Sequence, residues 1–328
     1  MNIRYSVLDL VPIVEGSNVK EALHNSINLA KHVESLGFYR YWVAEHHSMP
    51  GIGSAATALV MSYIAQATKS IRVGAGGIML PNHAPLIIAE QFGTLESMHQ
   101  GRIDLGLGRA PGTNPQTMLA IRGDTTKTGD DFPEKLQELR NFFLPSTDNK
   151  SVMSIPGEGC NIPIWLLGSS DFSARLAARL GLPFSFASHF TPENTMAAIN
   201  YYRSTFVPSS DLSRPYYMVA LNVFAADTNK VAYKISTSSQ QQFLSLIRNK
   251  PSKMPPPVDD MDVLWSNHEK LAVLSRLDST VIGTKEEVKK GINEFVSKTG
   301  ANEIIIVCST YDINDRKRSY EIIAEAVM

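Results

Sequence analysis

Short apolar runs alternate along this chain with longer stretches that have a helical period. The clearest helical stretch covers 19–36, where apolar residues recur every three or four positions until Gly37, a residue type that often ends a helix. Eight apolar runs predict strands, at 3–8, 41–44, 71–80, 102–107, 163–167, 184–187, 219–225 and 304–307. Helices are predicted after them, at 19–36, 54–67, 85–98, 133–143, 172–180, 192–206, 285–298 and 314–327.

Eight strand–helix units in 328 residues favour a closed (β/α)8 barrel, an α/β fold of the TIM-barrel type, over a doubly wound sheet. The predicted strands are apolar on both faces, as buried parallel strands require. No change of composition divides the chain, so we expect one domain over 1–328. Two insertions interrupt the pattern, at 111–132 and at roughly 248–283, and the proline-rich second one suggests a mobile lid or an oligomer contact.

The composition is that of a soluble globular protein, with 43% hydrophobic and 19% charged residues. A net charge of −1 leaves no basic surplus to neutralise phosphates, so nucleic acid is not an expected partner. No apolar run reaches the roughly 18 residues of a membrane span, and the first residues lead into a predicted strand rather than a signal peptide. The two cysteines form no CxxC pair, and a buried free thiol at Cys308 and a cytoplasmic location are expected.

A barrel keeps its functional residues at the carboxyl ends of its strands. One of these ends is rich in glycine and carries a single arginine, Arg109, whose forked cation suits a phosphate. A Rossmann dinucleotide site is the alternative, but position 111 is proline where that motif needs its third glycine. The residues at the predicted strand ends are Asp9, Glu45-His46-His47, Gly74–Gly77, Gly106–Arg109, Gly168–Ser170 and Ser188-His189.

Several of these strand ends allow more than one interpretation. The pair His46-His47 could bind metal, could be satisfied by structural hydrogen bonds, or could act in acid–base chemistry, which an imidazole near working pH suits. Neither HxH nor HExxH is present, so no metal site is expected. Two glycines in an apolar strand, Gly76 and Gly77, indicate a bulge or a flat ligand on the backbone. The turn 168–170 offers either an anion site at a helix N-terminus or a plain helix cap.

Five motifs in this order make the chain resemble the bacterial luciferase-like flavin monooxygenases, most closely their alkanal-monooxygenase-like branch. The resemblance spans the whole chain, and the ordered set is specific although each motif alone is weak. The matching segments are Trp42–His47 (WVAEHH), Val73–His83 (VGAGGIMLPNH), Ala89–Leu95 (AEQFGTL), Gly101–Gly112 (GRIDLGLGRAPG) and Trp165–Ser170 (WLLGSS).

The resemblance implies a barrel that holds reduced FMN and uses O2 to oxygenate a small organic substrate. His46 matches the family's catalytic histidine, and the bond between Gly76 and Gly77 matches a non-prolyl cis peptide beneath the flavin ring. Arg109 and Ser170 match phosphate-binding positions. The cofactor contacts predicted on this basis are Gly76, Gly77, Arg109, Gly168, Ser169, Ser170 and Ser188.

The expected partners follow from the same resemblance. The sequence shows no second nucleotide module for NADH, so FMNH2 is expected from a separate flavin reductase, and the protein is expected to form a homodimer. Gly108 stands where the luciferase α subunit has a reactive cysteine, and the lid region is shorter, so light emission and long-chain aldehyde specificity are not carried over. Two alternatives stay open: an F420-dependent oxidoreductase on the same fold, and a non-catalytic flavin-binding protein, against which His46 argues.

Overall fold

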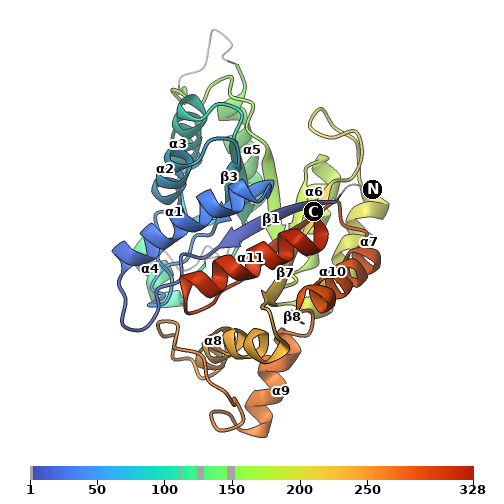
Figure 1. Ribbon diagram of the computed structural model, residues 1–328. Helices are drawn as coiled ribbons and strands as arrows, with labels where there is room; N and C mark the ends of the chain where they lie inside the picture. Colours follow the sequence, from blue (N-terminus) through green and yellow to red (C-terminus); the bar gives the residue numbers. More distant parts are fainter. Residues whose placement is uncertain (1–2, 111, 124–128, 146–151) are drawn as a thin grey trace.

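Eight parallel strands pair around a closed ring in the computed structural model, which describes residues 3–110, 112–123, 129–145 and 152–328 (Figure 1). Each strand pairs with the next along the chain from β1 to β7; β9 lies between β7 and β1 and closes the ring. The predicted (β/α)8 barrel is therefore confirmed. The barrel strands are β1 (Arg4–Asp9), β2 (Arg40–Val43), β3 (Arg72–Met79), β4 (Ile103–Gly108), β5 (Ile164–Gly168), β6 (Phe184–Phe186), β7 (Tyr217–Ala225) and β9 (Glu303–Val307).

Helices cover the outside of this barrel, and their ends follow local sequence signals. Asn18 begins the first of them by accepting a hydrogen bond from the backbone N–H of Glu21, and Gly300 ends another in the left-handed region at φ 63°. The sequence predicted these helices to within a few residues. They are α1 (Val19–Ser35), α2 (Thr57–Ala67), α3 (Pro85–Met98), α5 (Phe132–Phe143), α6 (Asp171–Leu180), α7 (Thr195–Thr205), α10 (Lys285–Thr299) and α11 (Ile313–Val327).

The amino end of the barrel is closed by buried charges. Arg40 lies between two carboxylates, 2.6 Å from Asp104 and 3.0 Å from Glu303, and Arg72 binds Asp104 at 2.7 Å. Apolar side chains then fill the barrel interior above this layer. A ligand can therefore enter only from the opposite end, where the strands finish. The interior side chains are Leu8, Trp42, Ala44, Trp165, Met218, Ala220, Ile305 and Val307.

The segment after β7 differs from the prediction. It was expected to be irregular up to residue 284, but it contains α8 (Asn229–Ile247), α9 (Asn267–Arg276) and a short strand β8 (Val281–Gly283) that pairs with the end of β7. The sequence hides α8 because five consecutive polar residues, 236–240, are all buried, so no apolar period marks the helix. Figure 1 shows α8 and α9 together at one end of the molecule, where they share a small core around Trp265.

The first insertion also contains regular structure. A two-turn helix, α4 (Pro115–Arg122), begins at Asn114, whose side chain accepts from the backbone N–H of Thr117. Two short 3-10 helices are also present: η1 (Leu80–Asn82) follows β3, and η2 (Pro192–Asn194) precedes α7. Residues 111 and 124–128 of the predicted insertion 111–132 lie outside the described residues. The roles of both insertions stay predictions.

Candidate active site at the carboxyl ends of the strands

The glycines of β3 and β4 let two backbones approach closely at the mouth of the barrel. The peptide bond between Gly76 and Gly77 is cis, and the pairing of β3 with β4 shifts register between Gly76 and Ile78. A Cβ atom on Gly77 would lie 2.7 Å from the carbonyl oxygen of Gly106. The predicted cis bond and the predicted bulge are both confirmed as geometry, while contact with a flavin stays a prediction.

Arg109 lies beside the beginning of α6. Its guanidinium stacks on the Phe172 ring at 4.0 Å from the ring centroid, and none of the described residues accepts a hydrogen bond from it. The neighbouring strands explain the placement, because Gly108 pairs with Leu167 where β4 and β5 end. Ser170 is the N-cap residue of α6, and its side chain makes no capping hydrogen bond. Arg109, which no described residue neutralises, and the N-terminus of α6, where the Ser170 hydroxyl makes no cap bond, therefore share one corner of the mouth.

The turn before α6 depends on the glycine at its first position. A Cβ atom on Gly168 would come within 2.9 Å of the Ser173 side chain, whose hydroxyl donates to the carbonyl oxygen of Leu167 at 2.7 Å. The end of β5 and the first turn of α6 are thus packed tightly together. Ser169 and Ser170 project at the rim, where both are at least partly exposed. The sequence allowed two interpretations of this segment, an anion site and a plain helix cap. The structure does not show a cap formed by the Ser170 hydroxyl.

The adjacent histidines after β2 occupy different environments. The Nε2 atom of His47 donates to the buried carboxylate of Glu45 at 2.8 Å, so His47 is the histidine that structural hydrogen bonds satisfy. His46 is partly buried, and its backbone N–H donates to the carbonyl oxygen of Ser54 at 3.1 Å. Burial lowers the pKa of His46, and the charge of Glu45 and the backbone of Gly112 oppose that shift. His46 is therefore a largely neutral imidazole at pH 7.

Glu45 is the centre of a buried hydrogen-bond cluster that sequence reasoning missed. Its carboxylate accepts from His83 and Asn82 at 2.9 Å and from the backbone N–H of Met79 at 2.9 Å, in addition to His47. Burial alone would raise the pKa of Glu45, but the hydrogen bonds from His83, Asn82 and His47 outweigh it and lower the pKa. The only available signal was a carboxylate at a strand end, in the segment 42–47. The cluster fixes the loop that carries His46.

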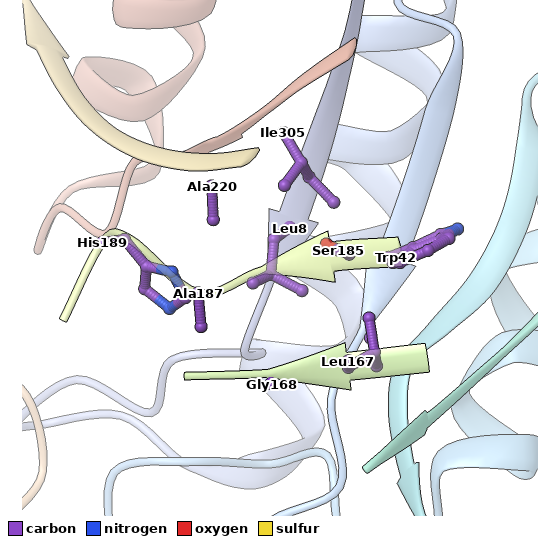
Figure 2. A pocket seen from close by; sticks show the side chains of 10 residues that line it. Leu8, Trp42, Leu167, Gly168, Ser185, Ala187, His189, Ala220 and Ile305 are labelled. Atoms are coloured by element: carbon purple, nitrogen blue, oxygen red, sulfur yellow. The ribbon is translucent and has the colours of Figure 1, made fainter. Parts of the chain in front are cut away.

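The end of β6 contributes a second imidazole to the mouth. Alternate residues Ser185, Ala187 and His189 line a cavity of about 50 Å³ inside the barrel, and Figure 2 shows the His189 ring at its edge. Ser188 points out of this cavity, because its hydroxyl is buried and accepts from Thr195 at 2.9 Å. A cavity of this size is well below the roughly 300–1,000 Å³ of ligand pockets, so a cofactor would lie above it at the open mouth.

Asp9, the polar residue at the end of β1, belongs to the scaffold. Its carboxylate is fully buried and accepts from the Arg316 guanidinium at 2.9 Å and from the backbone N–H of Val11 at 2.9 Å. The hydroxyls of Ser26 and Tyr41 donate to the other oxygen. With both oxygens committed, Asp9 joins β1 to α1 and α11 and is not available to a ligand.

No group of three or more histidine, cysteine, aspartate or glutamate side chains in the described ranges could hold a metal ion. No helix in these ranges is long and apolar enough to cross a membrane.

The fold and the site together point to an enzyme class: a (β/α)8 barrel whose mouth carries Arg109, the start of α6, the cis peptide Gly76–Gly77 and the histidines at the ends of β2 and β6. Residues 3–303 match the family model for luciferase-like monooxygenases. A luciferase-like monooxygenase of Escherichia coli strain K12 is 47% identical over 98% of this chain and 96% of its own length. The uncharacterized protein YvbT of Bacillus subtilis is 54% identical over 98% of this chain and 95% of its own. The chain belongs to the luciferase-like monooxygenase family.

Solved structures agree with this assignment. The crystal structure of apo-MsnO8 superimposes with a TM-score of 0.88 at 32% identity, covering 99% of this chain and 98% of that one. Two more distant structures share the fold alone. One is the oxygenating constituent of a 3,6-diketocamphane monooxygenase in complex with FMN, at TM-score 0.73 and 20% identity, covering 100% and 98% of the two chains. The other is an F420-dependent secondary alcohol dehydrogenase, at TM-score 0.72 and 18% identity, covering 100% of each chain.

Proposed function

We propose that this protein is an FMN-dependent monooxygenase that uses reduced flavin and O2 to oxygenate a small organic substrate. The observation that carries the proposal is the corner formed by Arg109 and the start of α6. The Arg109 guanidinium stacks on Phe172, in the first turn of α6, and no described residue neutralises its charge. The adjoining Ser170 hydroxyl makes no cap bond. A dianionic phosphate fits this corner, because both the arginine and the helix N-terminus favour negative charge.

The rest of the mouth suits the remainder of such a cofactor. Gly76 and Gly77 carry no side chains of their own that would keep a flat ring system from the backbone, and the side chains of Trp42 and Leu167 occupy the positions that Cβ atoms would take. Arg109, Ser169 and Ser170 would hold the phosphate, and Gly168 would let the chain approach it. When bound, reduced FMN supplies the electrons that activate oxygen. The protein binds and orients the ring and keeps bulk water away from it.

His46 is the group that we assign to proton transfer at this site. Its lowered pKa leaves the imidazole neutral at pH 7, able to take up a proton or to donate one hydrogen bond. Its neighbour His47 is committed to the Glu45 carboxylate and serves to hold the loop. The assignment therefore gives the two adjacent histidines different roles.

We also propose that FMNH2 reaches the site from a separate flavin reductase. The barrel strands in the described ranges form one closed sheet, and we place the flavin at its mouth. F420 is the competing cofactor, since one structural neighbour uses it on this fold. A non-catalytic flavin-binding role would leave His46 without a purpose. The homodimer stays a prediction.

Titration with FMN tests the proposal. Arg109→Ala should weaken FMN binding about tenfold to a hundredfold, because a charge-assisted hydrogen bond contributes about 1.5–3 kcal/mol. Binding is followed by the change in flavin fluorescence, with Arg276→Ala, an exposed arginine on α9, as the matched control. F420 is titrated in parallel. An Arg109→Ala variant with parental FMN affinity would remove this corner from the site, and tighter binding of F420 than of FMN would favour the alternative cofactor.

A further inference from the structure

One imidazole nitrogen inside the barrel mouth has no hydrogen-bond partner among the described residues. The Nδ1 atom of His189 is buried, and none of the residues in the described part of the chain makes a hydrogen bond with it. The backbone of this residue is held in place, because its carbonyl oxygen accepts from the Asn222 side chain at 2.6 Å. The ring packs edge-on against Phe190, with centroids 4.7 Å apart. A buried polar atom without a partner costs free energy unless a ligand or water satisfies it.

The cavity beside His189 is almost entirely apolar. In the close view of Figure 2, aliphatic side chains from four different strands line the cavity and the imidazole lies at its edge. The Ser185 hydroxyl also lines the cavity. No acidic or cationic side chain is among the lining residues. A charged group placed here would lose its hydration without gaining a counter-ion. The apolar lining is formed by Leu8, Trp42, Leu167, Ala187, Ala220 and Ile305.

We propose that His189 and this cavity form a substrate subsite, which takes an uncharged part of an organic molecule and forms one hydrogen bond with it. The proposal rests on the proposed function, because it places the substrate next to the cofactor at the same mouth. His189 thereby becomes a substrate-binding residue, distinct from His46 after β2. Charged groups of a substrate would remain outside the cavity, at the mouth.

The charge state of the imidazole agrees with this geometry. Burial and, to a smaller extent, the nearby His46 together lower the pKa of His189 to about 3. The ring is therefore neutral at physiological pH, with one nitrogen that donates and one that accepts. Such a ring can bind a hydroxyl, a carbonyl or a similar neutral group, but it provides no positive charge for a carboxylate.

Calorimetric titration with two probes of the same shape tests the subsite. Cyclohexanol carries a neutral hydroxyl that can donate or accept, so it suits either tautomer of His189; its ring is larger than the cavity of about 50 Å³ and would extend into the mouth. Cyclohexanecarboxylate carries a charge on the same ring. The parent should bind cyclohexanol more tightly than the carboxylate. His189→Phe should weaken cyclohexanol binding about threefold to tenfold, the usual contribution of one net hydrogen bond, while His189→Asn should recover most of the loss. The control is His24→Phe, an exposed histidine on α1.

The FMN affinity of the same variants separates the possible failures. The subsite predicts parental FMN affinity in His189→Phe; a loss of FMN binding without a loss of cyclohexanol binding would make His189 a cofactor contact and overturn the proposal. Unchanged cyclohexanol affinity in His189→Phe, a preference of the parent for the carboxylate, or no cyclohexanol binding at all would also contradict it. If the parent does not bind FMN, the proposed function fails, yet the probe titrations with flavin-free protein still decide whether the subsite exists.

Discussion

Replacing Glu45 should destabilise the protein more than replacing almost any exposed carboxylate. Its side chain is 1% exposed and accepts four hydrogen bonds of 2.8–2.9 Å, three from side chains and one from the backbone of Met79. Removing one member of a buried charged cluster usually costs about 3–5 kcal/mol, so Glu45→Ala should lower the free energy of unfolding by about that amount. Glu45→Gln should lower the free energy of unfolding by about 1–3 kcal/mol. The glutamine amide keeps one acceptor oxygen, but its NH2 group would face one of the groups that donate to the carboxylate.

The assay is urea denaturation followed by circular dichroism, with Glu294→Gln as control. Glu294 is exposed on α10, and its single ion pair in the described part of the chain, with Lys290, is long at 4.0 Å and lies in solvent. Its replacement should therefore change the free energy of unfolding by less than about 0.5 kcal/mol. The pKa of Glu45 is lowered in the folded protein from the ordinary 4.5, so the ionised carboxylate stabilises the fold above that value. The deficit of Glu45→Gln should therefore shrink between pH 5 and pH 3.5. A deficit below 1 kcal/mol at pH 7, or one that grows over this acidic range, would refute the reasoning.

Two further predictions concern the barrel and its thiols. A Cβ atom on Gly106 would lie 2.1 Å from the carbonyl oxygen of Ala75, so Gly106→Ala should lower the free energy of unfolding by at least about 3 kcal/mol. A Cβ atom on Gly101 would have no atom within 4 Å, so Gly101→Ala should lower it by only about 1–2 kcal/mol, because the φ of +75° strains an alanine. Urea denaturation of both variants measures this, and equal losses would contradict the packing argument. Burial raises the pKa of Cys308 to about 11, so a disulfide reagent at pH 8 should label only the partly exposed Cys160 until the protein is denatured. Rapid labelling of two thiols in the native protein would be the contrary result.

The sequence was sufficient for the barrel because its strands carry a strong local signal. Runs such as 304–307 are apolar on both faces, and glycines punctuate the helix ends, so each unit could be predicted without its neighbours. The helix α8 could not be predicted in the same way. Its buried residues 236–240 are serine, threonine and glutamine, which become buried only because α9 and the loops around it pack against them.

The site was predictable where a residue type alone points to chemistry, and not where its partners decide its role. Arg109 in a glycine-rich turn already suggested an anion, and the structure adds its contact with the start of α6. Residue type alone does not distinguish the two adjacent histidines; the resemblance selected His46, and the structure adds the carboxylate of Glu45, which binds His47. His189 was visible as a polar residue at a strand end, but the unpartnered Nδ1 atom is a property of the folded surroundings.

The comparison of His46 with His47 in reduced, FMN-loaded protein tests the central claim most directly. Each variant, His46→Ala and His47→Ala, is mixed with O2 in a stopped-flow instrument, and the delay before oxidised flavin returns is recorded. We expect His46→Ala to bind FMN nearly as the parent does and to shorten this delay by about 10²–10⁴-fold, the contribution of a positioned acid–base group. His47→Ala should remain within a few-fold of the parent, because its imidazole is committed to Glu45. A His46→Ala variant that behaves like the parent, or a larger effect in His47→Ala, would contradict the assignment.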